Sequence, residues 1–349
     1  MSRLREDSRI DPRLKAFFGD WVAVTLDDVA SRQELLRIES TPEAANQHRF
    51  LTGMLDSMDG EDVAPSSGIT PEVLSIASSP DGNAIPILID RPANGDALPC
   101  VCYIHGGAMQ CLSCRNGNYR AWSRLIAAHG VVVAMIDFRN CLLPSSAPEV
   151  APFPAGLNDC VSGLRYLHEH ARALGIDGDR IVVAGESGGG NLAIASALKL
   201  NRDGDVGILS GIYALCPYVA GKWPLPQNPS SISNNLILMD THHNRGRMAY
   251  GIEAFEARNA LAWPGFATEA DVRGLPPVVI SVNECDPLRD EGVGFYRLLL
   301  KAGVSARCRE SVGTTHAAEL FPRVCPDLSR EAAQAIAHFA IDSRVSEKS

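Results

Sequence analysis

One short segment of this 349-residue sequence, residues 185–189, constrains the fold more than any other. It reads Gly-Glu-Ser-Gly-Gly, follows the apolar run 181–184 and precedes an Ala- and Leu-rich helical pattern at 191–200. Small residues around Ser187 let the chain turn sharply from strand to helix and project the serine beyond the sheet edge. The start of the helix also adds positive potential where an oxyanion would develop. We interpret Ser187 as a nucleophile; the alternative is an incidental serine in a Gly-rich turn.

Short apolar runs alternate with longer amphipathic patterns along the chain. Strands are predicted at 101–105, 131–136, 181–184, 207–215, 278–282 and 305–310, and helices at 119–128, 157–174, 191–200, 290–303 and 329–339. Strands that are apolar throughout and separated by helices indicate a parallel sheet covered on both faces. Residues 73–76 and 85–91, joined by Pro-Asp-Gly-Asn, predict an antiparallel hairpin ahead of that sheet. The prediction is an α/β fold with a mostly parallel central sheet flanked by helices.

Two stretches break this alternation. Residues 1–65 are helical and amphipathic in pattern, and residues 217–273 are a long insertion rich in Pro, Asn, Trp and Ser. Long insertions in compact domains commonly form lids or binding loops. We therefore divide the chain into an N-terminal part of a cap (1–65), a first part of the core (66–216), a cap insertion (217–273) and a second part of the core (274–349). Five aromatic residues of the insertion would either line a substrate pocket or form a small core of their own: Trp223, Tyr250, Phe255, Trp263 and Phe266.

The composition limits the partners that this chain can have. Asp and Glu number 41 and Lys and Arg 32, so the formal net charge is −9 at pH 7. An acidic protein repels nucleic acid and anionic membrane surfaces, and no apolar run reaches the length that crosses a bilayer. The start of the sequence carries mixed charge without an apolar signal segment. We therefore expect no nucleic-acid or membrane partner and a cytoplasmic location.

The sequence contains ten cysteines, several of them inside apolar runs, where cysteine commonly acts as a small buried hydrophobe. In a reducing cytoplasm we expect no disulfides. Cys111 and Cys114 have the spacing of a zinc or redox pair, but zinc needs four ligands and no second pair follows at ligand distance. We expect neither a metal nor an organic cofactor.

A second motif lies upstream, where the apolar run 101–105 leads into His105-Gly106-Gly107. Glycine allows backbone N–H groups to approach a developing negative charge closely. His-Gly-Gly at a strand end, ahead of a Gly-x-Ser-x-Gly turn, is typical of an oxyanion-stabilising loop. A simple strand-end turn is the alternative. We expect His105 to orient the loop rather than to transfer protons.

A nucleophilic serine in this setting needs an acid and then a histidine later in the chain. Four histidines follow Ser187: His242, His243, His316 and His338. The first two fall in the insertion, too early for this order, and the last lies in the final helical pattern. His316 follows the last predicted strand in a Gly-containing loop, which is where the base is expected. We therefore assign the base to His316.

Three carboxylates follow the predicted strand 278–282: Asp286, Asp290 and Glu291. Asp286 precedes a proline, which keeps it extended and out of the next helix. Asp290 and Glu291 fall in the first helical turn, where acidic residues are common because they complement the helix dipole. We therefore expect Asp286 to hold the imidazole of His316 in the required tautomer.

Together these segments resemble the hormone-sensitive-lipase family of α/β-hydrolases, in its bacterial esterase branch. The resemblance is carried by HGGAM at 105–109, DFRN at 137–140, GESGGGNLAIA at 185–195 and NECDPLRDEG at 283–292. It implies the α/β-hydrolase fold, with a helical cap built from N-terminal helices and a mid-chain insertion.

The same resemblance implies roles for single residues. It assigns the catalytic triad to Ser187, Asp286 and His316. It assigns the oxyanion hole to three backbone N–H groups, those of Gly106, Gly107 and Gly188. The family usually has a further glycine in this loop, where the present chain has Ala108.

The implied activity is hydrolysis of small, short-acyl carboxylic esters or lactones through an acyl-enzyme, without metal or cofactor. One alternative is a non-catalytic small-molecule receptor on the same fold, which would lack the histidine base. A second is a serine amidase or peptidase, which usually carries a propeller domain that this sequence has no repeat to form. His316 and its loop favour the hydrolase over the receptor. A homodimer, formed through an exposed sheet edge, is a further expectation.

Overall fold

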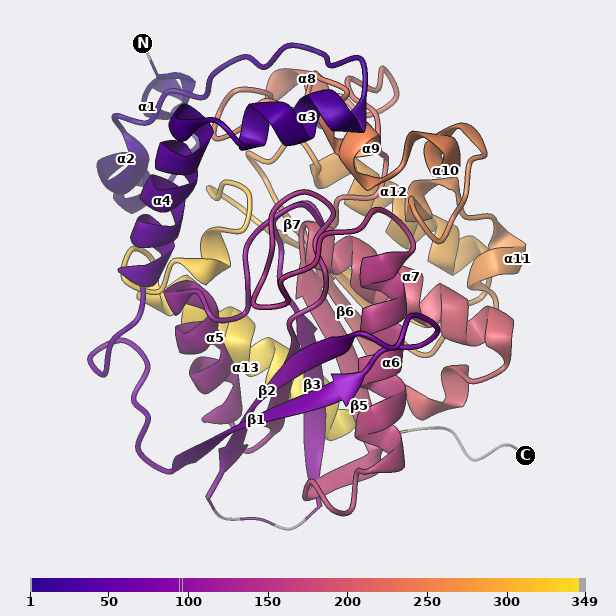
Figure 1. Ribbon diagram of the computed structural model, residues 1–349. Coiled ribbons are helices and arrows are strands. Elements are labelled where there is room, and N and C mark those ends of the chain that lie inside the picture. The colour runs from indigo at the N-terminus through magenta and orange to yellow at the C-terminus, as the bar shows by residue number, and fades with distance from the viewer. Residues whose placement is uncertain (1, 94, 96, 345–349) are drawn as a thin grey trace.

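The computed structural model describes residues 2–93, 95 and 97–344. Its strands are β1 (Ile69–Ala77), β2 (Ala84–Pro92), β3 (Leu98–Ile104), β4 (Val132–Ile136), β5 (Ile176–Glu186), β6 (Gly211–Leu215), β7 (Val278–Asn283) and β8 (Ala306–Ser311). They form one sheet in the order β1-β2-β4-β3-β5-β6-β7-β8, with helices on both faces (Figure 1). The strand β2 runs antiparallel to both of its neighbours, and β3 to β8 pair in parallel. The predicted α/β fold with a mostly parallel sheet and a preceding hairpin is confirmed.

Five helices cover the sheet: α5 (Gly117–Ala127) and α13 (Pro326–Asp342) on one face, and α6 (Ala155–Glu169), α7 (Gly188–Asp203) and α12 (Arg289–Lys301) on the other. Trp122 and Ile336 are fully buried on the first face, and Leu192 and Leu299 on the second. Every residue of β4 and β7 is buried. Strands buried on both faces are mostly apolar along their length, which is why they appear in the sequence as nearly continuous apolar runs; Ser281 and Asn283 are the polar positions of β7.

Several element boundaries differ from the predicted ones, and two of these differences have a clear physical reason. The strand predicted from residue 207 begins only at Gly211, because a 3-10 turn, η1 (Val206–Ile208), precedes it. The helix predicted to reach residue 174 ends at Glu169, and the chain then turns back toward β5 through Gly175, whose φ is 65°. Leu174 is 7% exposed, so this residue of the turn is buried although it lies outside the helix. Its position in the sequence coincides with the helical spacing only by chance.

Apart from the short helix Glu269–Val272, which packs against α7 and α12, the N-terminal helices and the insertion helices lie together above the sheet (Figure 1). The helices of the two segments are α1 (Arg3–Glu6), α2 (Pro12–Phe18), α3 (Arg32–Glu39), α4 (Pro42–Asp56), α8 (Ser230–Ser233), α9 (Arg245–Tyr250), α10 (Ile252–Glu256) and α11 (Glu269–Val272). Side chains tie the two segments together: Trp21 Nε1 donates to the carbonyl of Leu238 at 2.9 Å. The Asn244 amide exchanges hydrogen bonds with the backbone N–H and C=O of Val29 at 2.8 and 2.7 Å. The two stretches that broke the sequence pattern therefore pack against each other, while the division into domains stays a prediction.

The aromatic residues of the insertion pack mainly against one another. Trp263 is fully buried, with ring centroids 5.7 Å from Tyr250 and 6.3 Å from Phe255. Trp223 stacks on Tyr218 at 4.6 Å. These rings form an interior for the insertion that is continuous with the core of the sheet. This packing supports the core role for Trp223, Tyr250 and Trp263, whereas Phe255 and Phe266 also line a pocket.

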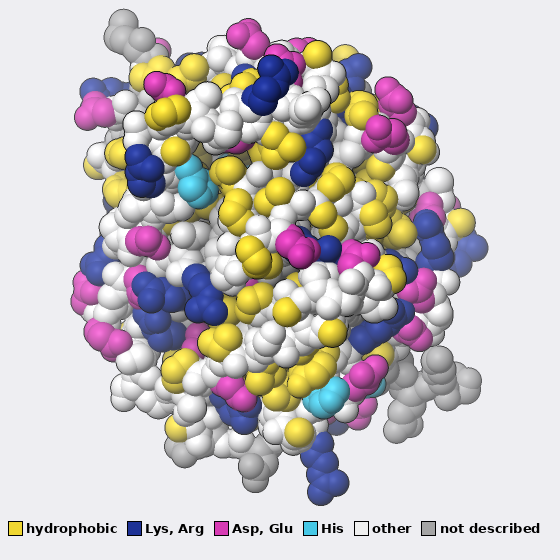
Figure 2. Space-filling view, in the orientation of Figure 1, with side chains coloured by type: hydrophobic (Ala, Val, Ile, Leu, Met, Phe, Trp, Pro, Cys, Tyr) yellow, Lys and Arg dark blue, Asp and Glu magenta, His cyan; other side chains and the backbone are white. Residues whose placement is uncertain are grey.

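The face drawn in Figure 2 mixes acidic and basic side chains around hydrophobic ones near its middle. Charges of both signs are interspersed on it, although the net charge of the whole chain is −9. None of the described helices combines the length and the apolar character that crossing a bilayer requires.

A buried ion pair fixes the segment that follows β4. Asp159 is fully buried and accepts hydrogen bonds from Nε and Nη2 of Arg139, both at 2.9 Å. It also accepts from the Arg139 backbone N–H at 2.9 Å and from Ser78 Oγ at 2.5 Å. This carboxylate therefore joins α6, the hairpin and the segment after β4.

Replacing Asp159 with alanine is predicted to lower the free energy of unfolding by about 3–5 kcal/mol, because Arg139 would lose its buried partner and keep only the more exposed Asp81 and Glu149. The matched control is Asp205→Ala, which removes an exposed ion pair with Arg165 and should change that free energy by less than about 1 kcal/mol. Urea titrations of both variants measure the difference. Equal effects of the two substitutions would contradict the role given to the buried pair.

Candidate active site

Ser187 lies in the turn between β5 and α7. Its backbone adopts φ 55° and ψ −119°, a positive φ that residues other than glycine rarely adopt. Its N–H donates to the carbonyl of Leu215 at 2.9 Å, and its own carbonyl accepts from the N–H of Tyr218 at 3.0 Å. These bonds hold the strained turn against the end of β6. The geometry is that of a serine projected at a sharp strand-to-helix turn.

The glycines beside Ser187 are required because β3 passes directly against the turn. A Cβ atom built on Gly185 would lie 2.7 Å from the carbonyl oxygen of Ile104, and one on Gly189 would lie 2.0 Å from the same oxygen. Both distances are shorter than side chains tolerate next to backbone atoms. The close approach of the two segments therefore excludes larger residues at these positions.

Asp286 and His316 form a hydrogen-bonded pair at the same edge of the sheet. Nδ1 of His316 lies 2.7 Å from Oδ2 of Asp286, whose side chain is fully buried, and the His316 side chain is 11% exposed. Oδ1 of Asp286 accepts a second hydrogen bond, from the N–H of Leu288 at 2.9 Å. Burial opposes a charged imidazole, but the carboxylate outweighs it, so the pKa of His316 lies well above its ordinary value.

The structure places the three predicted residues at the same edge of the sheet, since Ser187, Asp286 and His316 follow the ends of the parallel strands β5, β7 and β8. Ser187 is bonded through its N–H to Leu215. The next residue, Cys216, has its thiol within 4.8 Å of ligand atoms of both Asp286 and His316. Among the described residues Ser187 Oγ makes no hydrogen bond to the imidazole. Contacts of this kind are often long until a substrate binds.

The loop that carries His316 is supported by a carboxylate that the sequence analysis missed. Glu319 lies in η3 (Ala318–Leu320), is 2% exposed and accepts from Nδ2 of Asn283 at 3.0 Å and from Ser311 Oγ at 3.3 Å. The same amide of Asn283 donates to Thr314 Oγ1 at 2.8 Å. These bonds tie the end of β7 to the loop before the histidine. Nothing in the local sequence distinguishes Glu319 from a surface acid.

One of the three predicted oxyanion donors is occupied inside the protein. The N–H of Gly106 donates to Oε1 of Glu186 at 2.7 Å and lies 3.0 Å from the hydroxyl of Tyr119. Glu186 also accepts from the hydroxyls of Tyr119 at 2.5 Å and Tyr103 at 2.8 Å. Burial raises the pKa of this carboxyl, whereas the two hydroxyls act in the opposite direction. The N–H of Gly106 is therefore not free to face a ligand, which corrects the expectation for this residue.

The next residues of the loop turn their backbone toward the start of α7. Gly107, Ala108 and Met109 have φ values of 88°, 54° and 60°. A Cβ atom built on Gly188 would lie 2.7 Å from the backbone nitrogen of Ala108. Within the described part of the chain, the N–H groups of Gly107 and Ala108 donate no hydrogen bond, and the first N–H groups of a helix have no partner inside it. Free N–H groups therefore gather beside Ser187.

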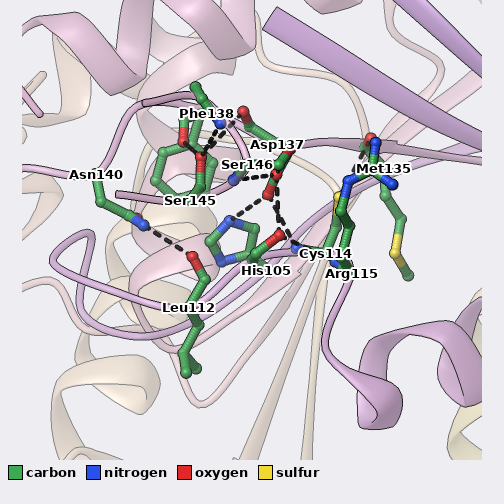
Figure 3. A network of polar contacts seen from close by, with 12 residues as sticks. His105, Leu112, Cys114, Arg115, Met135, Asp137, Phe138, Asn140, Ser145 and Ser146 are labelled. Atoms are coloured by element: carbon green, nitrogen blue, oxygen red, sulfur yellow. Dashed lines mark hydrogen bonds and ion pairs between the residues drawn. The ribbon is translucent and has the colours of Figure 1, made fainter. Parts of the chain in front are cut away.

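His105 and Asp137 form the support beneath this loop (Figure 3). Both are fully buried, and Nε2 of His105 lies 3.5 Å from Oδ1 of Asp137. The imidazole stacks on Phe138 with ring centroids 4.4 Å apart. Asp137 also accepts from the N–H of Cys114 at 3.0 Å and from that of Ser146 at 2.8 Å. Burial opposes ionisation of Asp137, but His105, the Ser146 hydroxyl and the N–H of Cys114 outweigh it and hold the pKa of its carboxyl well below the usual range.

Comparison with known proteins gives consistent results. A family model described as the alpha/beta hydrolase fold matches residues 101–320. Carboxylesterase NlhH of Mycobacterium tuberculosis (strain ATCC 25618 / H37Rv) is 32% identical over 237 residues, which cover 67% of this chain and 71% of that protein. The solved structure of esterase Est22 superposes with a TM-score of 0.96 at 56% identity, over 97% of this chain and 99% of Est22. Brefeldin A esterase, a bacterial homologue of human hormone sensitive lipase, gives a TM-score of 0.85 at 35% identity, over 97% of this chain and 95% of that structure.

The close approach of the Ser187 turn to β3 gives a prediction with a matched control. Gly189→Ala is expected to lower the free energy of unfolding by about 1–3 kcal/mol or more, because its Cβ meets rigid backbone. Gly294→Ala, in helix α12 with nothing within 4 Å of the added Cβ, should be neutral or stabilising by up to about 1 kcal/mol. Urea unfolding of both variants measures the two changes. Gain of stability in both variants would show that the turn has room to relax.

Proposed function

The chain belongs to the hormone-sensitive-lipase type of α/β-hydrolases and is a carboxylesterase, and we propose that it acts through Ser187, His316 and Asp286. The observation that carries this proposal is the 2.7 Å hydrogen bond between His316 and the buried Asp286, at the sheet edge where the strained turn presents Ser187. A nucleophile, a base and a group that orients the base are the three parts that acyl transfer to a serine requires.

In the first half of the reaction, His316 takes the proton of Ser187 Oγ as that oxygen attacks the ester carbonyl carbon. The carbonyl becomes a tetrahedral oxyanion. The intermediate then breaks its bond to the alcohol oxygen, and His316 gives the proton to this leaving group. The alcohol leaves, and the acyl group stays bound to Ser187.

In the second half, water replaces the alcohol. His316 removes a proton from the water as its oxygen attacks the acyl carbon, and a second tetrahedral oxyanion forms. Collapse of this intermediate breaks the bond to Ser187 Oγ, which receives the proton back from His316. The carboxylic acid leaves and the starting enzyme is restored. Every proton passes through His316, so this scheme draws on the residues of the chain and on water alone.

We assign the oxyanion hole to the N–H groups of Gly107, Ala108 and Gly188. In this set the N–H of Ala108 takes the place that the sequence analysis gave to the N–H of Gly106, because the latter is bonded to Glu186. The positive φ values at 107 and 108 support this set. The close packing at Gly188 also supports it, because a Cβ atom added there would lie 2.7 Å from the nitrogen of Ala108. Preorganised donors in a site that excludes water stabilise the developing charge without reorganising during the reaction.

The favoured substrates are small, short-acyl esters or lactones, and this finer statement rests on the resemblance to bacterial members of the family. Esters are favoured over amides because an alkoxide leaves more readily than an amine. A receptor without catalysis is disfavoured by the presence of the intact His316–Asp286 pair.

Ser187→Ala is predicted to reduce kcat for p-nitrophenyl acetate by about 10³-fold or more, because the attacking oxygen is lost while the oxyanion donors remain. The wild-type protein should hydrolyse the acetate and butyrate esters faster than the palmitate ester, and all three faster than p-nitroacetanilide. Steady-state assays with each substrate measure these rates. Full activity of Ser187→Ala would refute the proposed nucleophile, and a preference for the anilide would favour the amidase.

The pH profile tests the role of Asp286. The base must be neutral, so kcat/KM rises with pH through the pKa of His316, which Asp286 places above the ordinary value for histidine. Asp286→Asn removes the negative charge that favours the imidazolium. It should therefore shift the acidic limb to lower pH while reducing kcat by about 10⁴-fold.

Measurement of kcat/KM over about pH 4 to 10 locates this limb, because this pH interval spans the range in which the pKa of histidine ordinarily lies. The control is Asp290→Asn, which changes a neighbouring carboxylate that pairs with Arg289 instead of the base. This control should leave the limb where it is. An acidic limb that does not move in Asp286→Asn would contradict the assigned role.

A further inference from the structure

We propose that Cys216, Asp286 and His316 form an inhibitory binding site for a thiophilic divalent cation, with Zn²⁺ as the best match. The inhibitory effect of the cation rests on the proposed function, because a cation bound to His316 blocks the base of the reaction. The site itself is argued from the positions and the chemistry of the three side chains.

The three side chains converge closely enough to share one cation. The thiol of Cys216, a carboxylate oxygen of Asp286 and a ring nitrogen of His316 all lie within 4.8 Å of one another. No second group of three such side chains lies this close in residues 2–93, 95 and 97–344. Bonds of about 2.0–2.3 Å in a tetrahedral zinc site separate the ligand atoms by about 3.5 Å. Adjustments of about 1 Å therefore complete the site.

The donor set selects the class of cation. A thiolate, an imidazole and a carboxylate suit zinc, whereas Mg²⁺ and Ca²⁺ prefer sites made of oxygen atoms. Three protein ligands leave a fourth position for water or another ligand.

Two of the ligands are held in place by the fold. Cys216 follows β6, its N–H donates to the carbonyl of Ser281 at 2.7 Å, and its backbone has φ 34°. Asp286 is fixed by the N–H of Leu288 and by His316. Cys216 and Asp286 have no exposed surface, whereas the His316 side chain is 11% exposed. A cation therefore enters from the side of His316, and this imidazole is the ligand that moves.

Binding changes the protonation of the site in a defined way. The thiol of Cys216 gives its proton to water as the Zn–S bond forms, and His316 binds through a nitrogen that carries no proton. The metal occupies the imidazole that would otherwise take the proton of Ser187, so ester hydrolysis stops while the protein stays folded. The simpler role for Cys216 is that of a small buried hydrophobe, and this role predicts no metal binding.

The first test measures inhibition. Zn²⁺ is expected to inhibit hydrolysis of p-nitrophenyl acetate by the wild-type protein. The inhibition of each variant is measured against its own uninhibited rate, and the inhibition constant of Cys216→Ala should be at least tenfold higher than that of the wild type. The matched control is Cys160→Ala, which removes another fully buried thiol, one that packs in the apolar core. This control should leave the inhibition constant unchanged. Equal inhibition of all three proteins, or none, would overturn the proposal.

The second test measures binding without activity. Cd²⁺ is titrated into Ser187→Ala protein, and the ultraviolet absorbance of the cadmium–thiolate bond is recorded. The signal should appear with one equivalent, disappear in Ser187→Ala/Cys216→Ala and persist in Ser187→Ala/Cys160→Ala. Persistence in the Cys216 variant would refute the site. If Cys216→Ala fails to fold, as judged by its thermal unfolding, Cys216→Ser replaces it, since serine is a poor ligand for cadmium.

The two proposals fail in different ways. A wild-type protein that hydrolyses no ester refutes the triad, but the cadmium titration still decides whether the site binds metal. Loss of hydrolysis in Ser187→Ala together with absence of the cadmium signal refutes the metal site and leaves the triad supported.

Discussion

A single buried carboxylate connects the two halves of the candidate site. Glu186 immediately precedes Ser187, yet its side chain reaches back to the neighbouring strand and binds the N–H of Gly106 and the hydroxyls of Tyr103 and Tyr119. One residue thus fixes the turn that carries the serine relative to the loop that would stabilise the oxyanion. Without a partner for Glu186, a carboxyl buried at this depth would cost several kcal/mol, so the tyrosines and the glycine N–H are as necessary as the acid.

This connection explains the sequence pattern around the serine. Because the loop and the turn are held in contact, there is no space for a side chain at Gly185 or Gly189, whose added Cβ atoms would meet the carbonyl of Ile104. The same contact directs the loop into positive φ at Gly107, Ala108 and Met109. A second buried pair, His105 and Asp137, then anchors the loop from below (Figure 3). Tight packing and satisfied polar groups together keep the free N–H groups in fixed positions, which electrostatic stabilisation of an oxyanion requires.

The sequence predicted those features that depend on local patterns. The continuous apolar runs identified the strands because strands buried on both faces cannot alternate, and the order of Ser187, Asp286 and His316 followed from the positions of strand ends. Features that depend on distant contacts were not accessible. The pairing of Gly106 with Glu186 joins residues 80 positions apart, so the sequence could not show that this N–H is occupied. The turn after α6 was misjudged for the same reason, because Leu174 is buried by tertiary packing outside a helix.

Ala108 illustrates how far local chemistry constrains such a site. The family usually has glycine here, and the φ of 54° explains this preference, because glycine adopts this region without the steric cost that a Cβ imposes. Alanine is nevertheless compatible with the loop, since the surrounding bonds determine its conformation: the carbonyl of Gly107 accepts from the N–H of Gln110 at 2.8 Å, and the carbonyl of Met109 accepts from that of Cys141 at 2.8 Å. A backbone N–H donor depends on the position of the peptide and only indirectly on the side chain. The substitution therefore preserves the donor that we assign to residue 108 and restricts mainly the space beside it, where the acyl group of a substrate would lie.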